Sequence, residues 1–566
     1  MAPKSVPNPP PLGFPVPDLP HAVSVQLSRW DDMVDFAQGK QRIRAVQQGG
    51  YPRTFLHRAV VCVHEACIEK FGNSNETCFV FPDARYALAC QNYLCYPPGG
   101  MVGLDIKDVR RLALEFDVAV HHALTESKAV NVARVTMHAV FIPVDKFSKA
   151  LAFWRLTGCG ILSRQAEDMV ERVDTMSVST SSNLHAAPLT APIPINQKAN
   201  KIIRNRIASL LNRAAIGDSR SVNVSAADVY LYPSGMSAIY NLTQALRGWP
   251  GTQTVVFGFP YELTLKTQQD FAKNCTFYGL GTPEELRQFE VSLSELASQG
   301  EMIQSVWCEC ASNPLLRTVD LNRIYQLADQ YGFVVVVDDT IGSFANVDVL
   351  NVSDVVVTSL TKSFSGFADV MGGSIALNPA SRFYQQLQAA LSAQYRNCLY
   401  SADAVKLEAN SRGFLPRAAI MNRNASHLVS ILGPLCRSIV ADSPLEHLYY
   451  PSCCWSAENY RSRMRQPTDD FVPGYGGLFT MQFRDVVVAS AFFDSLEVCK
   501  GPSLGAHVTL AQPYVQTVFA NEKAWAAKYG LNEAIVRISV GIEDAMALER
   551  VFLKAMNVAQ SAVEKT

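Results

Sequence analysis

The sequence predicts an α/β protein with a largely parallel sheet and an extra α/β module at its N-terminus. In the middle of the chain, strand-like runs rich in Val and Ile alternate with helical patterns. The runs are "DVYLYP", "QTVVFGF", "QSVWCEC", "GFVVVVDD", "DVVVTSL" and "GGSIALN". Near-continuous apolar strands separated by helices indicate a parallel sheet covered on both faces. Such a sheet binds ligands at the carboxyl ends of its strands, so the residues there are the candidates for function.

At 566 residues the chain is too long for one core, and several domains are expected. The predicted organisation is a Pro-rich leader (1–50), an N-terminal α/β module (51–173), a large domain (174–400) and a smaller C-terminal α/β domain (401–566). A Ser/Thr/Pro-rich stretch from Asp174 to Pro194 connects the module to the large domain. A long helix near Ser381 to Ser411 precedes the C-terminal domain.

Two of these regions are predicted in more detail. The leader begins "MAPKSVPNPPPLGFPVPDLP", whose prolines predict an extended, poorly ordered segment. In the N-terminal module, "HRAVVCVHEACIEKFG" has helical spacing with a Gly stop, and "ETCFVFPD" and "VNVARVTMHAVFIPVD" are strand-like. Nothing in this module assembles into a chemical site.

Composition excludes several function classes. The net charge is −1, which provides neither the basic field expected of a nucleic-acid-binding protein nor a polybasic membrane anchor. No stretch approaches the roughly 18 apolar residues of a spanning helix. The 14 cysteines form no Cys-x-x-Cys pair, which favours a reduced, cytoplasmic protein. His64, Glu65 and Cys67 lie close together in sequence but lack the second His of a helical zinc motif, so no metal is predicted.

Polar residues follow five of the predicted strands. Each is weak evidence alone, because polar turns, core tyrosines and surface lysines are common. The residues are Ser234-Gly235-Met236 opening a helix, Tyr261, Asn313, Asp338, and Lys362 between the hydroxyls of Ser359 and Thr361. Together they offer a phosphate cradle, a stacking ring, an anion for a pyridinium and an amine for a Schiff base, which are the groups that pyridoxal 5'-phosphate (PLP) requires. The glycine fingerprints of nucleotide sites are missing.

The residues from about 186 to 558 resemble the Cys/Met-metabolism family of fold-type I PLP-dependent transferases, and the cystathionine γ-synthase branch most closely. The matching segments are "YPSGMSAIYN", "ASNPLLRTVDL", "VVVVDDTIGSF", "SLTKSFSGFADVMGG", "GYGGLF", "GPSLG" and "VRISVGIED". The leader and first module resemble the long N-terminal region of fungal members. The resemblance implies a large PLP-binding domain followed by a smaller C-terminal domain.

The resemblance also implies residue roles. Lys362 and Tyr261 would be the catalytic residues: Lys362 would carry the cofactor and act as base, and Tyr261 would stack on the ring. The remaining cofactor-binding residues would be Gly235, Met236, Ser359 and Thr361 at the phosphate, Asp338 at the ring nitrogen and Asn313 near the phenolic oxygen. Arg537 would bind the substrate α-carboxylate, for which its planar fork is suited, and Ser503 would lie near the substrate or Lys362.

Some positions depart from the family pattern. The Tyr-x-Arg segment that a neighbouring subunit lends to the phosphate has no clear match in "APLTAPIPINQKANKIIRNR", unless Arg204 or Arg206 substitutes. Asp339 stands where Asn is usual, and Phe367 where many members have His. The glutamate expected soon after "SLG" is absent, with "AHVTL" in its place, and this change suggests an unusual substrate.

The expected reaction is a γ-substitution on an O-acyl-homoserine, with a thiol or carbon nucleophile, in sulfur amino-acid or specialised metabolism. Two alternatives stay open: a γ- or β-eliminating lyase of the same family, and a catalytically degenerate partner subunit. The resemblance implies a homodimer or homotetramer. The expected ligands are an amino-acid substrate and a nucleophilic co-substrate, with no nucleic acid or membrane.

Overall fold

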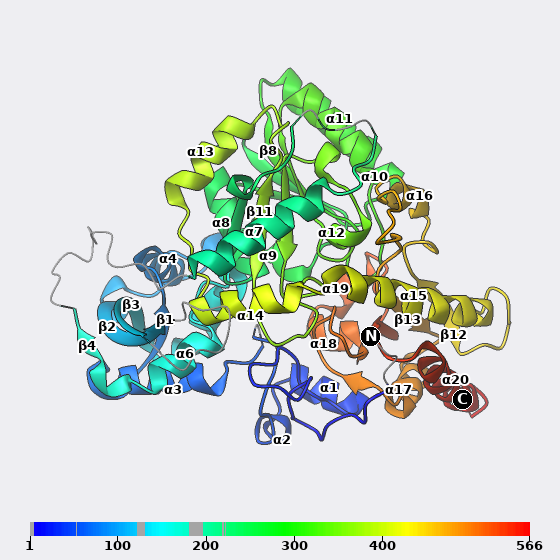
Figure 1. Ribbon diagram of the computed structural model, residues 1–566, viewed down its shortest axis with the longest axis horizontal. Coiled ribbons are helices and arrows are strands. Elements are labelled where there is room, and N and C mark those ends of the chain that lie inside the picture. Colours follow the sequence, from blue (N-terminus) through cyan, green and yellow to red (C-terminus); the bar gives the residue numbers. More distant parts are fainter. Residues whose placement is uncertain are drawn as a thin grey trace.

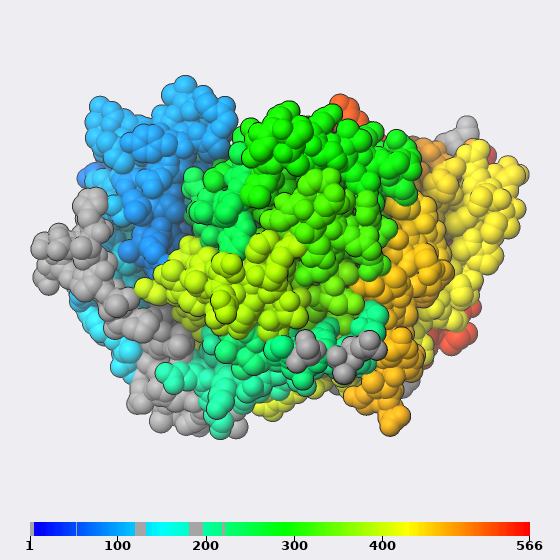
Figure 2. Space-filling view, turned by 90° about the horizontal axis from the view of Figure 1, so that it is seen from above, coloured from blue at the N-terminus to red at the C-terminus, as the bar shows by residue number. Residues whose placement is uncertain are grey.

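The computed structural model describes residues 5–52, 54–120, 131–179, 196–217, 220 and 222–565. Three sheets follow one another along the chain, with four, seven and five strands. The seven-stranded sheet lies at the centre, with the N-terminal module on one side and the C-terminal sheet on the other (Figure 1; Figure 2). None of the helices in the described ranges combines the length and hydropathy needed to cross a bilayer.

The central sheet has the strand order β5-β11-β10-β9-β8-β6-β7. Its strands are β5 (Val229–Tyr232), β6 (Gln253–Phe257), β7 (Cys275–Tyr278), β8 (Ile303–Glu309), β9 (Val334–Asp338), β10 (Val355–Ser359) and β11 (Gly373–Leu377). Strand β11 runs antiparallel to both its neighbours, β10 and β5, and the other pairings are parallel. The prediction of a largely parallel α/β sheet is confirmed.

Helices cover both faces of this sheet, which explains its apolar strands. In β9, Val334 and Val336 pack against α8 (Gly235–Leu246) on one face. Val335 and Val337 pack on the other face against α7 (Gln197–Asn212), α10 (Pro283–Ser298) and α11 (Leu321–Tyr331). All four valines are fully buried. Alternate residues of a strand point to opposite faces, so a strand covered twice has to be apolar throughout.

The N-terminal module is an antiparallel sheet with helices packed on it. The strand order is β1-β3-β2-β4, formed by β1 (Glu76–Phe81), β3 (Asn131–Pro143), β2 (Arg110–Val120) and β4 (Ser177–Val178). Its helices are α3 (Arg58–Phe71), α4 (Ala84–Cys95), α5 (Phe147–Thr157) and α6 (Ser163–Val170). The predicted helix matches α3, and the two predicted strands match β1 and β3. Because β4 pairs with β2, this sheet extends five residues beyond position 173.

The C-terminal sheet has the order β12-β13-β16-β15-β14 and supplies one wall of the site. Its strands are β12 (Leu445–Tyr449), β13 (Leu478–Phe483), β14 (Cys499–Lys500), β15 (Leu510–Gln512) and β16 (Ile535–Ser539). Its helices are α15 (Phe414–Leu432), α16 (Ala457–Arg461), α17 (Val486–Ser495), α18 (Tyr514–Val518), α19 (Lys523–Ala527) and α20 (Ala545–Val563). The chain between β14 and β15 contains Ser503, and Arg537 lies within β16.

The leader is ordered from Gly13 onward, so the prediction of a poorly ordered segment is wrong there. Gly13 and Phe14 pair through their backbones with Gln26. The leader then forms α1 (Trp30–Ala37) and α2 (Gln41–Arg44), and α1 lies beside α17 and α18 (Figure 1). Leu27 and Trp30 are buried in the core of the C-terminal sheet. A few apolar side chains anchor the segment despite its prolines.

Two further predictions concern connecting segments. The expected long helix near 381–411 is two helices, α13 (Tyr384–Gln394) and α14 (Ser401–Ser411). Between them the Tyr395 hydroxyl donates to the carbonyl of Leu231 on β5, at 3.0 Å, which holds the chain against the sheet edge. Most of the predicted connecting segment, residues 180–194, lies outside the described residues.

Candidate active site

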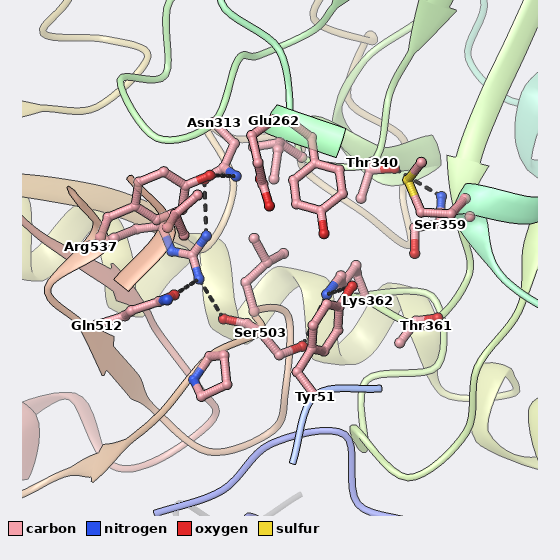
Figure 3. Close-up of a pocket in the computed structure, with 18 of the residues that line it drawn as sticks. Tyr51, Glu262, Asn313, Thr340, Ser359, Thr361, Lys362, Ser503, Gln512 and Arg537 are labelled. Atoms are coloured by element: carbon pink, nitrogen blue, oxygen red, sulfur yellow. Dashed lines mark hydrogen bonds between the residues drawn. The ribbon is translucent and has the colours of Figure 1, made fainter. Parts of the chain in front are cut away.

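A cavity of about 150 Å³ lies at the carboxyl ends of the central parallel strands, facing the C-terminal sheet. The structure brings all ten residues singled out from the sequence to its wall. They are Gly235, Met236, Tyr261, Asn313, Asp338, Ser359, Thr361, Lys362, Ser503 and Arg537. Figure 3 shows those among them that it labels, which converge from segments far apart in the sequence: Asn313, Ser359, Thr361, Lys362, Ser503 and Arg537. Their individual roles are predictions.

Lys362 follows β10 and projects its amine into the cavity (Figure 3). It is 8% exposed, which is unusual for lysine. Its Nζ donates hydrogen bonds to Ser503 Oγ at 3.0 Å and to Tyr51 Oη at 3.3 Å. The same nitrogen lies 4.5 Å from the centre of the Tyr51 ring. The amine is therefore held by two hydroxyls from distant parts of the chain.

The first turn of α8 meets the end of β10 closely enough to form a phosphate cradle. Ser234 caps α8 by accepting the N–H of Ser237 at 3.1 Å, which leaves the N–H groups of Gly235 and Met236 at the mouth of the helix. A Cβ at position 235 would lie 2.9 Å from Ser359 Cβ, so only glycine fits. Thr361 lines the same wall, but its hydroxyl already donates to the carbonyl of Gly372 at 3.3 Å.

Asp338 ends β9 with its carboxylate at the cavity wall. Its Oδ1 accepts the N–H of Thr340 at 2.9 Å. Burial raises the pKa of Asp338, and the hydrogen bonds from Thr340 oppose this shift only in part. A carboxylate in such a place needs a cationic partner to stay ionised. A protonated ring nitrogen would meet this need, and with the cradle and the amine of Lys362 the residues present fit PLP.

Glu309, which the sequence reasoning missed, connects two of the strand-end loops. One carboxylate oxygen accepts the N–H of Tyr261 at 2.6 Å, and the other accepts the N–H of Asn313 at 3.2 Å. Burial raises the pKa of Glu309, and the nearby charge of Asp338 raises it further. A single buried side chain therefore binds the backbones of both Tyr261 and Asn313.

Arg537 is 5% exposed and points its guanidinium into the cavity from β16. It donates to Asn313 Oδ1 at 3.0 Å, to Gln512 Oε1 at 2.6 Å and to the carbonyl of Ser503 at 2.8 Å. Asn313 in turn donates to the Tyr514 hydroxyl at 3.0 Å. Both polar ends of the Asn313 amide are therefore occupied by protein groups. A contact of Asn313 with the phenolic oxygen of the cofactor stays a prediction.

Other cavity residues come from regions where the sequence predicted no chemistry. Tyr51 and Phe36 come from the leader and its junction with the module, and Arg155 comes from α5 of the module itself. The sequence predicts no chemical site within the module itself, and the structure adds that Arg155 of the module lines the cavity. The sequence does contain a signal for Tyr51, because Tyr51-Pro52-Arg53 is a Tyr-x-Arg sequence, although it lies upstream of the segment in which that motif is expected. Arg53 lies outside the described residues.

The positions noted as departures lie outside the cavity wall. Arg204 donates to the Tyr395 hydroxyl at 2.8 Å, and Arg206 pairs with Glu408 at 2.8 Å, so within this chain both guanidinium groups bind other protein groups, away from the cavity wall. Phe367 packs over the guanidinium of Arg417, with 4.8 Å from the ring centre to Cζ.

Two family models match the chain. The model described as Cys/Met metabolism PLP-dependent enzyme matches residues 200–557, and the fungal trans-sulfuration enzyme N-terminal domain matches residues 59–161. The chain belongs to the Cys/Met-metabolism family of PLP-dependent enzymes. This confirms the predicted family and PLP as its cofactor.

Known members of the family differ in activity. The alanine racemase ungC of Aspergillus violaceofuscus is 37% identical over 94% of both chains. The cystathionine gamma-synthase of Neurospora crassa is 34% identical, over 97% of this chain and 98% of its own. The fold resembles the crystal structure of cystathionine gamma synthase from Xanthomonas oryzae pv. oryzae in complex with aminoacrylate and cysteine. That match has a TM-score of 0.52 and 22% identity, and covers 65% of this chain and 87% of that chain.

Proposed function

We propose that the protein replaces the γ-substituent of an activated homoserine, an O-acyl-L-homoserine, with a thiol or carbon nucleophile. The observation that carries the proposal is the role of Ser503 as a link between two cavity groups. Its hydroxyl accepts from Lys362 Nζ, and its carbonyl accepts from Arg537. The buried amine of Lys362 and the buried guanidinium of Arg537 are therefore both bound by the same residue, Ser503. This arrangement suits an amino acid whose carboxylate meets Arg537 while its α-carbon faces Lys362.

When bound, PLP withdraws electrons from the α-carbon of an amino acid, which makes removal of its protons and loss of a γ-substituent feasible. The chain's own residues hold the reactants. Gly235, Met236 and Ser359 would hold the phosphate, Asp338 would pair with the ring nitrogen, and Tyr261 would stack on the ring. Arg537 would bind the α-carboxylate through two parallel N–H donors, which fixes the orientation of the α-carbon.

Proton movement falls to Lys362, the one lysine that lines the cavity among the described residues. Its amine would take the α-proton, release it to water, and then take a β-proton, after which the acyloxy group leaves Cγ as a carboxylate with the electron pair of its C–O bond. The nucleophile would lose its own proton as it bonds to Cγ. Lys362 would return the β-proton to Cβ and, after taking up a proton from water, deliver one to Cα. The hydroxyls of Tyr51 and Ser503 would keep the amine aimed at these carbons between transfers.

The test uses the PLP-loaded protein, O-acetyl-L-homoserine and a panel of thiol and carbon nucleophiles, with products identified by mass spectrometry. We expect acetate release and a γ-substituted amino acid only when a nucleophile is present. Lys362→Ala should abolish turnover, whereas Lys554→Ala, at a 64% exposed side chain, should not alter it. Formation of 2-oxobutyrate and ammonia without a nucleophile would identify an eliminating lyase. No consumption of O-acetyl-L-homoserine would reject the proposal.

Amino-acid racemisation is a second candidate, favoured by the 37% identity to the alanine racemase ungC over almost the whole chain. It shares the first step, removal of the α-proton, but needs no leaving group. Incubating the loaded protein with L-alanine and separating the enantiomers by chiral chromatography tests it. D-Alanine formed at a rate matching the γ-replacement would make racemisation the preferred function.

We also propose that the protein works in the cytoplasm as a homodimer or homotetramer. All 14 cysteines are free, as expected in a reducing compartment. Family resemblance supports the oligomer. Light scattering on the purified protein measures its mass, and a monomer would reject this part of the proposal.

A further inference from the structure

The charged side chains that line the cavity fall into two groups. Glu309, Asp338, Lys362 and Arg537 each have hydrogen-bond partners in the protein. Arg155 and Glu262 complete the set. In the part of the chain that the structure describes, Arg155 Nε and Glu262 Oε2 are buried without a hydrogen-bond partner. Two opposite charges on half-buried side chains therefore line the cavity, and each has a buried polar atom without a hydrogen-bond partner among the described residues.

These two residues come from different parts of the fold that dock against each other. Arg155 lies in the last turn of α5, in the N-terminal module. Glu262 is the first residue of α9 (Glu262–Phe271), directly after Tyr261. The end of α5 is tied to the large domain by two hydrogen bonds: Thr267 Oγ1 to the carbonyl of Leu156 at 3.1 Å, and Ser234 Oγ to the carbonyl of Gly158 at 3.3 Å. The docking thus holds the end of α5 against α8 and α9, where Arg155 reaches the wall of the cavity.

Arg155 and Glu262 do not form an ion pair with each other. No ion pair joins them within 4.0 Å among the described residues, although the charge of Arg155 lowers the pKa of Glu262 against the upward effect of burial. Buried charges are normally paired, because desolvation is costly. A ligand with an ammonium and a carboxylate would supply a charged hydrogen-bond partner to both side chains at once.

We propose that Arg155 and Glu262 form a second recognition site in the cavity, which binds the zwitterionic head of the acceptor. This inference rests on the proposed γ-replacement and names the acceptor class: a nucleophile that carries both an ammonium and a carboxylate. Glu262 binds the ammonium, and Arg155 binds the carboxylate. The head of the first substrate stays at Arg537 and Lys362, whose existing contacts orient them for it. The N-terminal module thereby determines acceptor specificity.

The test measures equilibrium binding and needs no turnover. The ligands are L-cystathionine and L-ethionine, which share a thioether and one amino-acid head and differ only in the second head. Two intermediate ligands are S-(2-aminoethyl)-L-homocysteine, which lacks the distal carboxylate, and S-(2-carboxyethyl)-L-homocysteine, which lacks the distal ammonium. Dissociation constants are read from the visible absorbance of the loaded holoenzyme. Wild-type protein should bind L-cystathionine on the order of 10- to 100-fold more tightly than L-ethionine, the effect of added charge-assisted hydrogen bonds.

The variants separate the two roles. Glu262→Gln should remove the advantage that the distal ammonium gives, and Arg155→Met the advantage that the distal carboxylate gives. Both should leave L-ethionine binding unchanged. Glu284→Gln and Arg287→Met are the matched controls, because these two side chains pair with each other on the surface, each 65% exposed. Unchanged melting temperatures establish that the variants are folded.

Three results would overturn the inference. One is equal affinity of wild-type protein for L-cystathionine and L-ethionine. Another is equal weakening of all four ligands in either variant. The third is a fall in PLP affinity of Arg155→Met with ligand selectivity preserved, which would make Arg155 a phosphate ligand. Failure of the proposed function is read separately, from the lack of O-acetyl-L-homoserine turnover with uncharged 2-mercaptoethanol or any other thiol.

Discussion

Asp339 shows how one buried carboxyl couples stability to pH. It is 1% exposed, Oδ1 accepts the Thr358 hydroxyl at 2.6 Å, and Oδ2 has no hydrogen-bond partner among the described residues. Burial raises the pKa of Asp339 from 3.8 to about 7. The folded state therefore keeps this proton to a higher pH than the unfolded state does. The contribution of this proton to the free energy of unfolding is lost as the pH rises from about 4 to about 7, and the loss is complete above pH 7.

Asp339→Asn, which restores the residue usual in the family, should remove this dependence. The gain in unfolding free energy is at most about 4 kcal/mol at pH 8, from the shift of the pKa to about 7, and roughly 1–2 kcal/mol at pH 5. Thermal melting at both pH values measures it, with Asp329→Asn, whose side chain is 61% exposed, as the control. A gain of equal size at both pH values would show that Asp339 is not the titrating group.

Arg537 is expected to act through its planar fork as well as its charge. Removing it as Arg537→Ala should lower kcat/KM for the amino acid by on the order of 10- to 100-fold, mainly through KM, because a charged hydrogen-bond pair is lost. Arg537→Lys should recover only part of this, because an ammonium cannot donate two parallel bonds. Initial-rate kinetics on O-acetyl-L-homoserine measure both. Arg484→Ala, an exposed position just after β13, is the control, and unchanged kinetics in Arg537→Ala would reject the carboxylate role.

At the scale of elements, parallel topology explains which parts of the site were predictable. Gly235, Tyr261, Asn313 and Lys362 follow strands whose carboxyl ends share one sheet edge, so reading the strands was enough to group them. Arg155 was out of reach, because it depends on how a separate module docks on α8 and α9, which local sequence patterns do not encode.

Side chains beside the predicted ones were missed for a different reason. Glu262 is an ordinary residue for the first turn of a helix, where acids are favoured. Glu309 is a charged residue at the end of a predicted strand, where an acid is expected to face solvent. In the structure, all seven residues of its strand β8 are buried. Long-range packing gives both residues their surroundings.

The close approach of α8 to β10 yields a prediction for the phosphate cradle. Gly235→Ala would place a methyl group 2.9 Å from Ser359 Cβ, so the helix end or the strand end has to move away. We expect weaker PLP binding, by about 10-fold or more, since a cradle displaced by a few tenths of an ångström loses hydrogen-bond geometry. Absorbance titration of the apoprotein with PLP measures this. Gly248→Ala, just beyond the same helix, meets no atom within 4 Å and should bind PLP normally. Equal affinities would contradict the cradle.

Across the whole molecule, the central and C-terminal sheets supply most of the cavity wall, and the leader and the first module supply the rest. The leader is anchored on the C-terminal sheet near α17 before it passes the cavity, where Phe36 and Tyr51 line the wall (Figure 1; Figure 3). The contact of Tyr51 with Lys362 spans 311 residues of sequence. We therefore predict that the leader's anchor influences the position of the Lys362 amine.

Trp30 is the main anchor and gives a test of this coupling. It is 5% exposed, and its ring meets Phe493 edge-on with centres 6.0 Å apart. The backbone N–H of Trp30 also donates to Asp494 Oδ1 at 2.7 Å. Trp30→Ala should destabilise the leader's packing by about 3–5 kcal/mol. The leader should then become sensitive to limited proteolysis, and turnover should fall because Tyr51 no longer holds the amine of Lys362.

Trp455→Ala is the matched control, because Trp455 is 49% exposed. It should change neither the cleavage pattern nor turnover. Mass spectrometry of the cleavage products locates the first cut, which is expected before residue 50 in Trp30→Ala. Two results would contradict the coupling: a leader that stays resistant in that variant, or a leader that is cut while turnover on O-acetyl-L-homoserine is unchanged. In the second case the leader would be anchored by Trp30 without influence on Lys362.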